Sequence, residues 1–144
     1  MATAGYSGKP LPDKLGVKPG GTLYLMHVPA EVRAALVPLP AGARLAAAAR
    51  GRVMLLLCCV TSRAALVAAV PSLLERVAAD GAVWISWPKK ASPQFVDLTE
   101  DGIREVLLPT GLVDVKVCAV TDHWSGLKMM VRKERRADWE REGQ

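Results

Sequence analysis

Short apolar runs alternate along the chain with stretches that are apolar only at helical spacing, which predicts alternating strands and helices. Residues 53–60, VMLLLCCV, are apolar throughout and form the clearest strand. Such a run is typical of a strand buried on both faces, as in a parallel sheet covered by helices. The stretch 81–90, GAVWISWPKK, has the same character but breaks at Trp87-Pro88. Because proline has no backbone N–H to donate to a neighbouring strand, we expect this strand to end there. Lys89 and Lys90 would then lie at a functional edge of the sheet.

Weaker patterns supply the other elements. We predict further strands at 22–28, 113–120 and 127–132, and helices at 30–37, 62–79 and 98–108. Residues 43–50, ARLAAAAR, favour a helix by propensity. The order of the elements instead favours a strand, because the chain must return to an edge of the sheet before the strand at 53–60. We therefore predict a short edge strand within residues 43–50.

Local signals set the ends of the elements. Ser62 is expected to cap the second helix, and Pro71 to kink or split it. Asp97, with Glu100 three residues later, matches the start of the third helix. Turns are expected at residues 80–81 and 121–126.

These elements predict one α/β domain over residues 1–144, a three-layer Rossmann-like fold. Its sheet is mostly parallel, with helices on both faces and a C-terminal antiparallel hairpin. Residues 1–21 are interpreted as an N-terminal arm that packs on the body and holds one helical turn closed by Gly16. Residues 133–144 form a charged tail with nearly balanced signs, typical of a solvated helix end rather than a nucleic-acid arm.

Composition narrows the function classes. The formal net charge of +5 favours anionic partners such as nucleotides, phosphorylated metabolites or nucleic acid. The longest apolar run is far shorter than the roughly 20 residues of a membrane span, and the N-terminus lacks the apolar core of a secretory signal. We therefore expect a soluble cytoplasmic protein with no membrane partner. The adjacent Cys58 and Cys59 would point to opposite faces of a strand and are interpreted as small buried hydrophobes.

Two resemblances add to this interpretation. The chain contains the strings GYSGKPLPDKLGVKPG, AVWISWPKKAS and DLTEDGIREVLLPTGLVDVKVCAVTDHWSGLK, which are spread over residues 5–128. These strings are similar to a bacterial family catalogued as a domain of unknown function, a resemblance that implies a fold but no activity. The order of elements also resembles the Rossmann-like core of class I S-adenosylmethionine methyltransferases, shortened by about one strand–helix unit.

The methyltransferase resemblance implies a cofactor held by a glycine-rich turn after the first strand and by an acidic residue that ends the second. Here the first turn, residues 26–30, has no glycine, and the next glycine is Gly42. The candidate second strand, 43–50, has no Asp or Glu. The glycine-rich dinucleotide fingerprint and the phosphate-cradling loop are absent too. We therefore assign no cofactor, no metal ligand and no catalytic residue.

In a sheet wound in this way, the carboxyl ends of the parallel strands meet at one edge, where ligands gather. The candidate ligand-binding residues follow those ends: His27, Ser62, Trp87, Lys89, Lys90, Asp122, His123 and Trp124. The lysines would neutralise an anion, the tryptophan would offer a ring face, and the histidines would orient polar groups. These residues also have structural alternatives. Adjacent lysines are usually solvated, an Asp in a turn is ordinarily structural, and a tryptophan in the place of Trp124 more often covers the end of a core than stacks on a base.

Three functions remain open at this point. The leading hypothesis is a non-enzymatic module that binds an anionic small molecule, a nucleotide or a phosphometabolite, at the carboxyl edge. The alternatives are a divergent S-adenosylmethionine-dependent methyltransferase and a nucleic-acid or protein interaction domain. Because an exposed strand edge pairs readily, the hairpin also makes a homodimer an open alternative.

Overall fold

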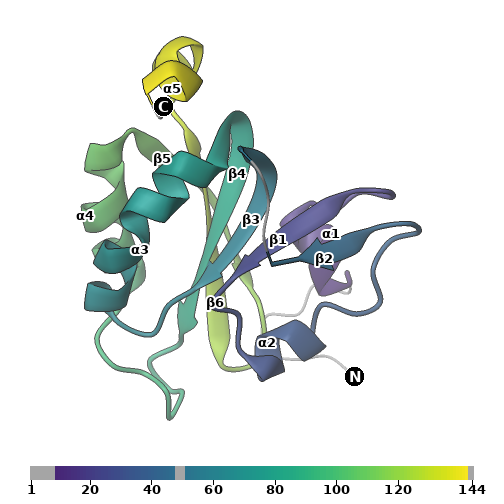
Figure 1. Cartoon of the computed structure of the whole chain (residues 1–144). Coiled ribbons are helices and arrows are strands. Elements are labelled where there is room, and N and C mark those ends of the chain that lie inside the picture. Colours follow the sequence, from purple (N-terminus) through teal and green to yellow (C-terminus); the bar gives the residue numbers. More distant parts are fainter. Residues whose placement is uncertain (1–8, 48–50, 143–144) are drawn as a thin grey trace.

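The computed structural model describes residues 9–47 and 51–142, with side chains to Trp139, and shows a six-stranded sheet covered by helices (Figure 1). In chain order the elements are α1 (Leu11–Leu15), β1 (Thr22–Met26), α2 (Ala30–Ala34), β2 (Arg44–Ala46), β3 (Val53–Cys59), α3 (Arg63–Arg76), β4 (Val77–Pro88), α4 (Glu100–Leu107), η1 (Leu108–Thr110), β5 (Leu112–Ala119), β6 (Trp124–Val131), η2 (Lys133–Arg135) and α5 (Arg136–Glu142). No helix of this described part is long and apolar enough to cross a membrane.

The strand order is β2-β1-β3-β4-β6-β5. The first four strands are parallel, and β6 runs antiparallel between β4 and β5. The predicted α/β, Rossmann-like, mostly parallel sheet with an antiparallel C-terminal pair is therefore confirmed. The ambiguous segment 43–50 contains the edge strand β2, as topology required, while its residues 48–50 lie outside the described residues.

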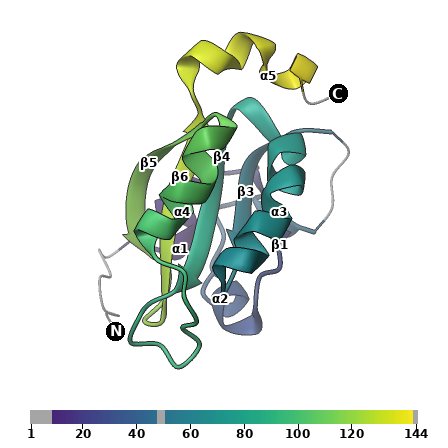
Figure 2. The same cartoon turned by 90° about the vertical axis from the view of Figure 1, so that its left-hand side faces the viewer.

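Helices cover both faces of the sheet and bury a separate apolar core on each. α3 and α4 lie on the face that is turned to the viewer in Figure 2, and α1 and α2 lie on the other. β4 lies between the two layers and sends alternate side chains into each, with Ile85 in one core and Trp84 in the other. The indole Nε1 of Trp84 donates a hydrogen bond of 2.9 Å to the carbonyl of Leu15. The described part of the predicted arm, from residue 9 on, therefore packs on the body, while residues 1–8 lie outside the described residues. Its helical turn ends at Gly16, whose φ is 93°.

The junction between α3 and β4 differs from the prediction. α3 ends at Arg76 and β4 begins at the next residue, so the expected turn at 80–81 lies inside the strand. The register of β3 against β4 shifts at this place, because Val53 pairs with Val77 and Leu55 with Ala82. The sequence signal at Gly81 therefore marks a strand irregularity and not a turn. Pro71 does not split α3, since it lies on the exposed side, where water can reach the carbonyl that its missing N–H leaves unpaired.

The cap of α4 is also not the predicted one. Thr99 caps this helix, and its Oγ1 accepts a hydrogen bond of 3.1 Å from the Gly102 N–H. Asp97 instead accepts a 2.9 Å bond from the N–H of Arg63 at the start of α3. An acidic residue before a helical pattern favours any helix start within reach, and only the tertiary structure decides which one.

The C-terminal hairpin turns earlier than the sequence indicates. The carbonyl of Trp124 accepts from the N–H groups of both Val120 and Thr121, at 2.9 and 3.1 Å. The turn is therefore complete by His123, and the residues Trp124, Ser125 and Gly126, expected in the turn, belong to β6. The charged tail forms η2 and α5, and it is not fully solvated, because Trp139 is buried and donates to the carbonyl of Val77.

Close packing of β4 on β3 leaves no room for a side chain at Gly81. An added Cβ would stand 2.9 Å from the carbonyl oxygens of Val53 and Met54. We expect Gly81→Ala to lower the free energy of unfolding by about 1–3 kcal/mol, measured by chemical denaturation. The control is Gly102→Ala, at a position inside the helix α4 where the nearest atom to the added Cβ is 3.4 Å away. We expect no decrease in the free energy of unfolding for this control. Equal destabilisation by both changes would contradict this account.

Burial should make two of the three thiols unreactive. Desolvation raises the pKa of both Cys58 and Cys59 from 9.0 to about 12. At pH 8 this lowers the thiolate fraction by about a thousandfold, so a maleimide should label these residues only after unfolding, and half-buried Cys118 should react first. The unfolded thiols lose their protons near pH 9 and the folded ones near 12. The free energy of unfolding should therefore fall as the pH rises through this range. Rapid native labelling of more than one thiol would contradict the prediction.

Candidate functional site

The carboxyl ends of the parallel strands meet at one edge, and hydrogen bonds join the turns that follow them. The N–H of Lys89, just beyond β4, donates to the carbonyl of His123 at 2.8 Å. The N–H of Val60, just beyond β3, donates to the carbonyl of Ser86 at 3.0 Å. The bend at Trp87-Pro88 and the turn that contains His123 are thus neighbours, as expected for a mostly parallel sheet.

Within this edge, the direction of the connections reverses between β1 and β3. β1 is followed through α2 by β2 on one side, whereas β3 is followed through α3 by β4 on the other. The two helices therefore leave the strands on opposite faces (Figure 1). In open α/β sheets, ligands bind in the crevice outside the carboxyl ends at such a reversal.

A pocket of about 460 Å³ occupies this place, and we call it the switch-point pocket. Its lining comes from the ends of β1 and β3, from the first turns of α3, from the loop after β4 and from the start of β6. The lining residues are His27, Pro29, Cys59, Val60, Thr61, Ala65, Ala68, Gln94 and Trp124. Most of the walls are apolar, and the polar groups are one imidazole, one hydroxyl and one amide.

Gln94 holds the loop after β4 against this pocket. Its Oε1 accepts a 3.1 Å hydrogen bond from Nε1 of Trp124, and its Nε2 donates a 2.8 Å bond to Oε1 of Glu31. The amide therefore links β6 to α2, two elements that are far apart in the sequence. Gln94 was not among the predicted site residues, because an isolated glutamine in an irregular loop carries no periodic or motif signal.

His27 has an unusual backbone. Its φ is 57°, the only positive value among the described residues that are not glycine. Such a conformation costs of the order of 1 kcal/mol and persists only where the surroundings enforce it, often at functional sites. The side chain is exposed and lines the switch-point pocket as well as a second pocket beside it.

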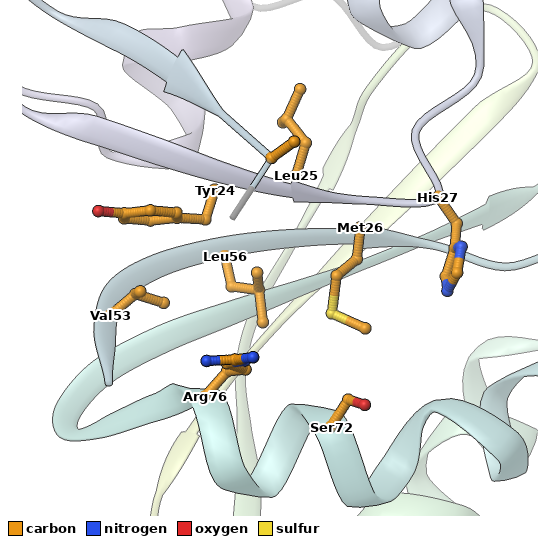
Figure 3. A pocket seen from close by; sticks show the side chains of 9 residues that line it. Tyr24, Leu25, Met26, His27, Val53, Leu56, Ser72 and Arg76 are labelled. Atoms are coloured by element: carbon orange, nitrogen blue, oxygen red, sulfur yellow. The ribbon is translucent and has the colours of Figure 1, made fainter. Parts of the chain in front are cut away.

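The second pocket, of about 510 Å³, lies between β1, β3 and α3, and we call it the α3-side pocket (Figure 3). It is lined by Tyr24, Leu25, Met26, His27, Ala47, Val53, Leu56, Ser72 and Arg76. The described residues between β2 and β3 form no helix that could cover β1 on this face. The apolar residues of β1 predicted a strand, but no local pattern indicates that one face of this strand stays partly open.

Of the eight predicted binding residues, only His27 and Trp124 line these two pockets. The Oγ of Ser62 accepts a 3.1 Å hydrogen bond from the N–H of Ala65, so Ser62 serves as the N-cap of α3. Trp87 is buried in the core beneath α3 and α4. The remaining four are partly or fully exposed and flank the switch-point pocket without lining it: Lys89, Lys90, Asp122 and His123.

The start of α3 offers less to an anion than its position suggests. Ser62 and Asp97 already accept hydrogen bonds from the N–H groups of Ala65 and Arg63. The carboxylate of Asp97 also places a negative charge beside this helix end. Among the described residues, no group of three or more His, Cys, Asp or Glu side chains is placed to hold a metal ion.

Comparison of the sequence with protein-family models finds no match, and comparison with curated proteins finds none either.

Proposed function

We propose that this protein binds a small anionic metabolite of the nucleotide type at the carboxyl edge of the sheet. The single observation that carries the proposal is the switch-point pocket, to which four separate segments contribute His27, Thr61, Gln94 and Trp124. An apolar pocket of this size with a few polar groups is typical of a small-molecule site.

The pocket and its flank differ in chemistry, and this difference supports a ligand with two parts. Inside, apolar walls and the polar groups of Thr61, Gln94 and His27 suit an uncharged ring with hydrogen-bonding edges. Outside, the backbone N–H of Lys89 donates to the carbonyl of His123, the residue before Trp124, and Lys90 follows Lys89 in the chain. The phosphate of a ligand whose ring fills the pocket would lie on this side, within the field of both lysines.

The one thiol in the lining does not act as a nucleophile in this proposal. Burial, as the main cause, raises the pKa of Cys59 to about 12, so Cys59 is not a thiolate at neutral pH. A divergent methyltransferase is the second candidate, because the pocket lies at the place where Rossmann-like proteins hold a nucleoside cofactor. Against it, His27 and not a glycine holds the left-handed position after β1.

Calorimetric titration with adenosine and with adenosine monophosphate tests the proposal, since the two differ only in the charged group. We expect the monophosphate to bind more tightly, and the double change Lys89→Ala and Lys90→Ala to weaken it about tenfold or more, with little effect on adenosine. The matched control is Lys18→Ala with Lys133→Ala, two other exposed lysines. Gln94→Ala should weaken both ligands.

Equal affinity for the two compounds, or no heat from either at millimolar concentration, would overturn the proposal as stated. S-adenosylmethionine and its demethylated product belong in the same titration series. Binding of these two with no response to adenosine monophosphate would favour the enzymatic candidate. Binding to mixed oligonucleotides that weakens steeply with salt would favour nucleic-acid interaction instead.

A further inference from the structure

The hairpin of β5 and β6 ends the sheet, and part of one of its faces lies outside both cores (Figure 2). Met129 and Val131 of β6 belong to the core beneath α3 and α4, so Met130 between them points to the opposite face. Val113 of β5 pairs with Met130 and lies on the same face. Neither Val113 nor Met130 belongs to the core that α1 and α2 bury on this side, and both stay partly exposed.

A pocket of about 310 Å³ lies beside these two residues, and we call it the hairpin-face pocket. Its floor includes Val115, the extra residue at the register shift between Asp114 and Lys116, whose exposed fraction is 49%. One end of the pocket is charged, because η2 and the start of α5 complete it. The lining residues are Val113, Val115, Met130, Val131, Arg132, Lys133, Glu134 and Arg136.

Arg132 is the residue at the charged end that we assign to recognition. The Nε of Arg136 donates a 3.0 Å hydrogen bond to the carbonyl of Val131, so Arg136 serves the fold. Arg132 follows Met130 by two residues and has an extended backbone, with φ −55° and ψ 140°. Among the side chains that the structure describes, no carboxylate forms an ion pair with Arg132.

Two lysines stand opposite each other on the other side of the apolar floor. Lys116 of β5 pairs with Lys128 of β6, two residues before Met130. Like charges at opposite positions of an antiparallel pair destabilise the sheet. In the described part of the chain, no carboxylate forms an ion pair with either lysine. The two charges thus oppose folding without a compensating contact inside the protein, which favours a role toward an anionic partner.

The spacing of these groups indicates the class of partner. Lys128 and Arg132 are four residues apart with Met130 midway, a distance of about 13 Å in an extended chain. None of the lining residues is aromatic, so the pocket offers no platform on which a nucleic-acid base could stack. The apolar centre is a hollow, which can receive a projecting side chain. An extended peptide presents residues i, i+2 and i+4 on one side at the same spacing.

We infer that the hairpin face binds an extended acidic segment of another protein, with the pattern acidic–x–apolar–x–acidic. The apolar side chain enters the hairpin-face pocket, one carboxylate lies against Lys116 and Lys128, and the other pairs with the guanidinium of Arg132 through charge-assisted hydrogen bonds. Each exposed ion pair contributes little by itself, so the affinity depends on all three contacts together. The site shares no lining residue with the switch-point pocket.

The capped peptide TETLTET and its neutral match TQTLTQT are suitable probes. Titration of the full chain, followed by amide NMR shifts, should show the acidic peptide binding about tenfold more tightly or better. The double change Lys116→Gln and Lys128→Gln should weaken the acidic peptide about tenfold or more and the neutral one less than twofold. The matched control is Lys18→Gln with Arg33→Gln, two exposed cations that do not line the pocket.

Stability separates recognition from a structural role of the lysines. Lys116→Gln removes the repulsion from Lys128, so it should raise the midpoint of chemical denaturation while it weakens peptide binding. Val115→Glu, at a half-exposed position, should leave the fold intact and abolish binding of the acidic peptide, because it places a carboxylate in the pocket. Both variants should bind adenosine monophosphate as the unmodified protein does, since neither residue lines the switch-point pocket.

Several outcomes would overturn the inference. Equal affinities for the two peptides, or no binding of either at millimolar concentration, would show that this face does not select an acidic segment. Binding of the acidic peptide that survives the lysine double change or Val115→Glu would place the site elsewhere. Oligonucleotide binding that the lysine double change abolishes, without any peptide binding, would assign this face to nucleic acid instead.

Discussion

The parallel pairing of β1 with β3 is the constraint on which the rest of this structure depends. Tyr24 pairs with Leu56 and Met26 with Cys58, although β2 separates the two strands in the sequence. Because the chain must leave β1 on one side and β3 on the other, the carboxyl ends of these strands remain uncovered by their own connections. The same pairing places His27 beside the segment that begins at Val60 and creates both pockets.

The left-handed backbone of His27 follows from this arrangement. The chain leaves the end of β1 for Pro29 and the short helix α2, while β3 continues past it toward α3. Within these few residues the chain changes direction through a left-handed backbone conformation at His27. Glycine adopts this conformation at little cost, whereas histidine adopts it with strain. The strained residue is the only one shared by the two pockets. Its imidazole therefore lies between two spaces of different chemistry, one beyond the sheet and one on its face.

Much of the positive charge of this protein serves its fold. Arg52 donates hydrogen bonds of 2.7 and 2.9 Å to the carbonyls of Leu74 and Val77, at the junction of α3 and β4. Arg104 pairs with Glu100, Asp101 and Asp114, and so ties α4 to β5. The hydrogen bonds that this guanidinium donates to Glu100 and Asp114 raise its pKa further above the ordinary range. A net charge of +5 thus says little about where a ligand binds, because arginines that satisfy carbonyls and carboxylates count equally in the sum.

The sequence by itself determined the elements whose signal is local. A continuous apolar run is enough to specify β3, and the break at Trp87-Pro88 is enough to end β4, because proline lacks a ladder donor wherever it occurs. Tertiary structure alone decided the partners of ambiguous residues. Asp97 accepts a hydrogen bond from the N–H of Arg63 at the start of α3 and does not cap α4, and Gly81 lies inside a strand, against two carbonyl oxygens of β3, and not in a turn. It also decided the pockets, since Gln94 is placed only by Glu31 and Trp124, which the fold brings to it. Local patterns encode propensity and burial, whereas a site depends on distances between segments that no local pattern contains.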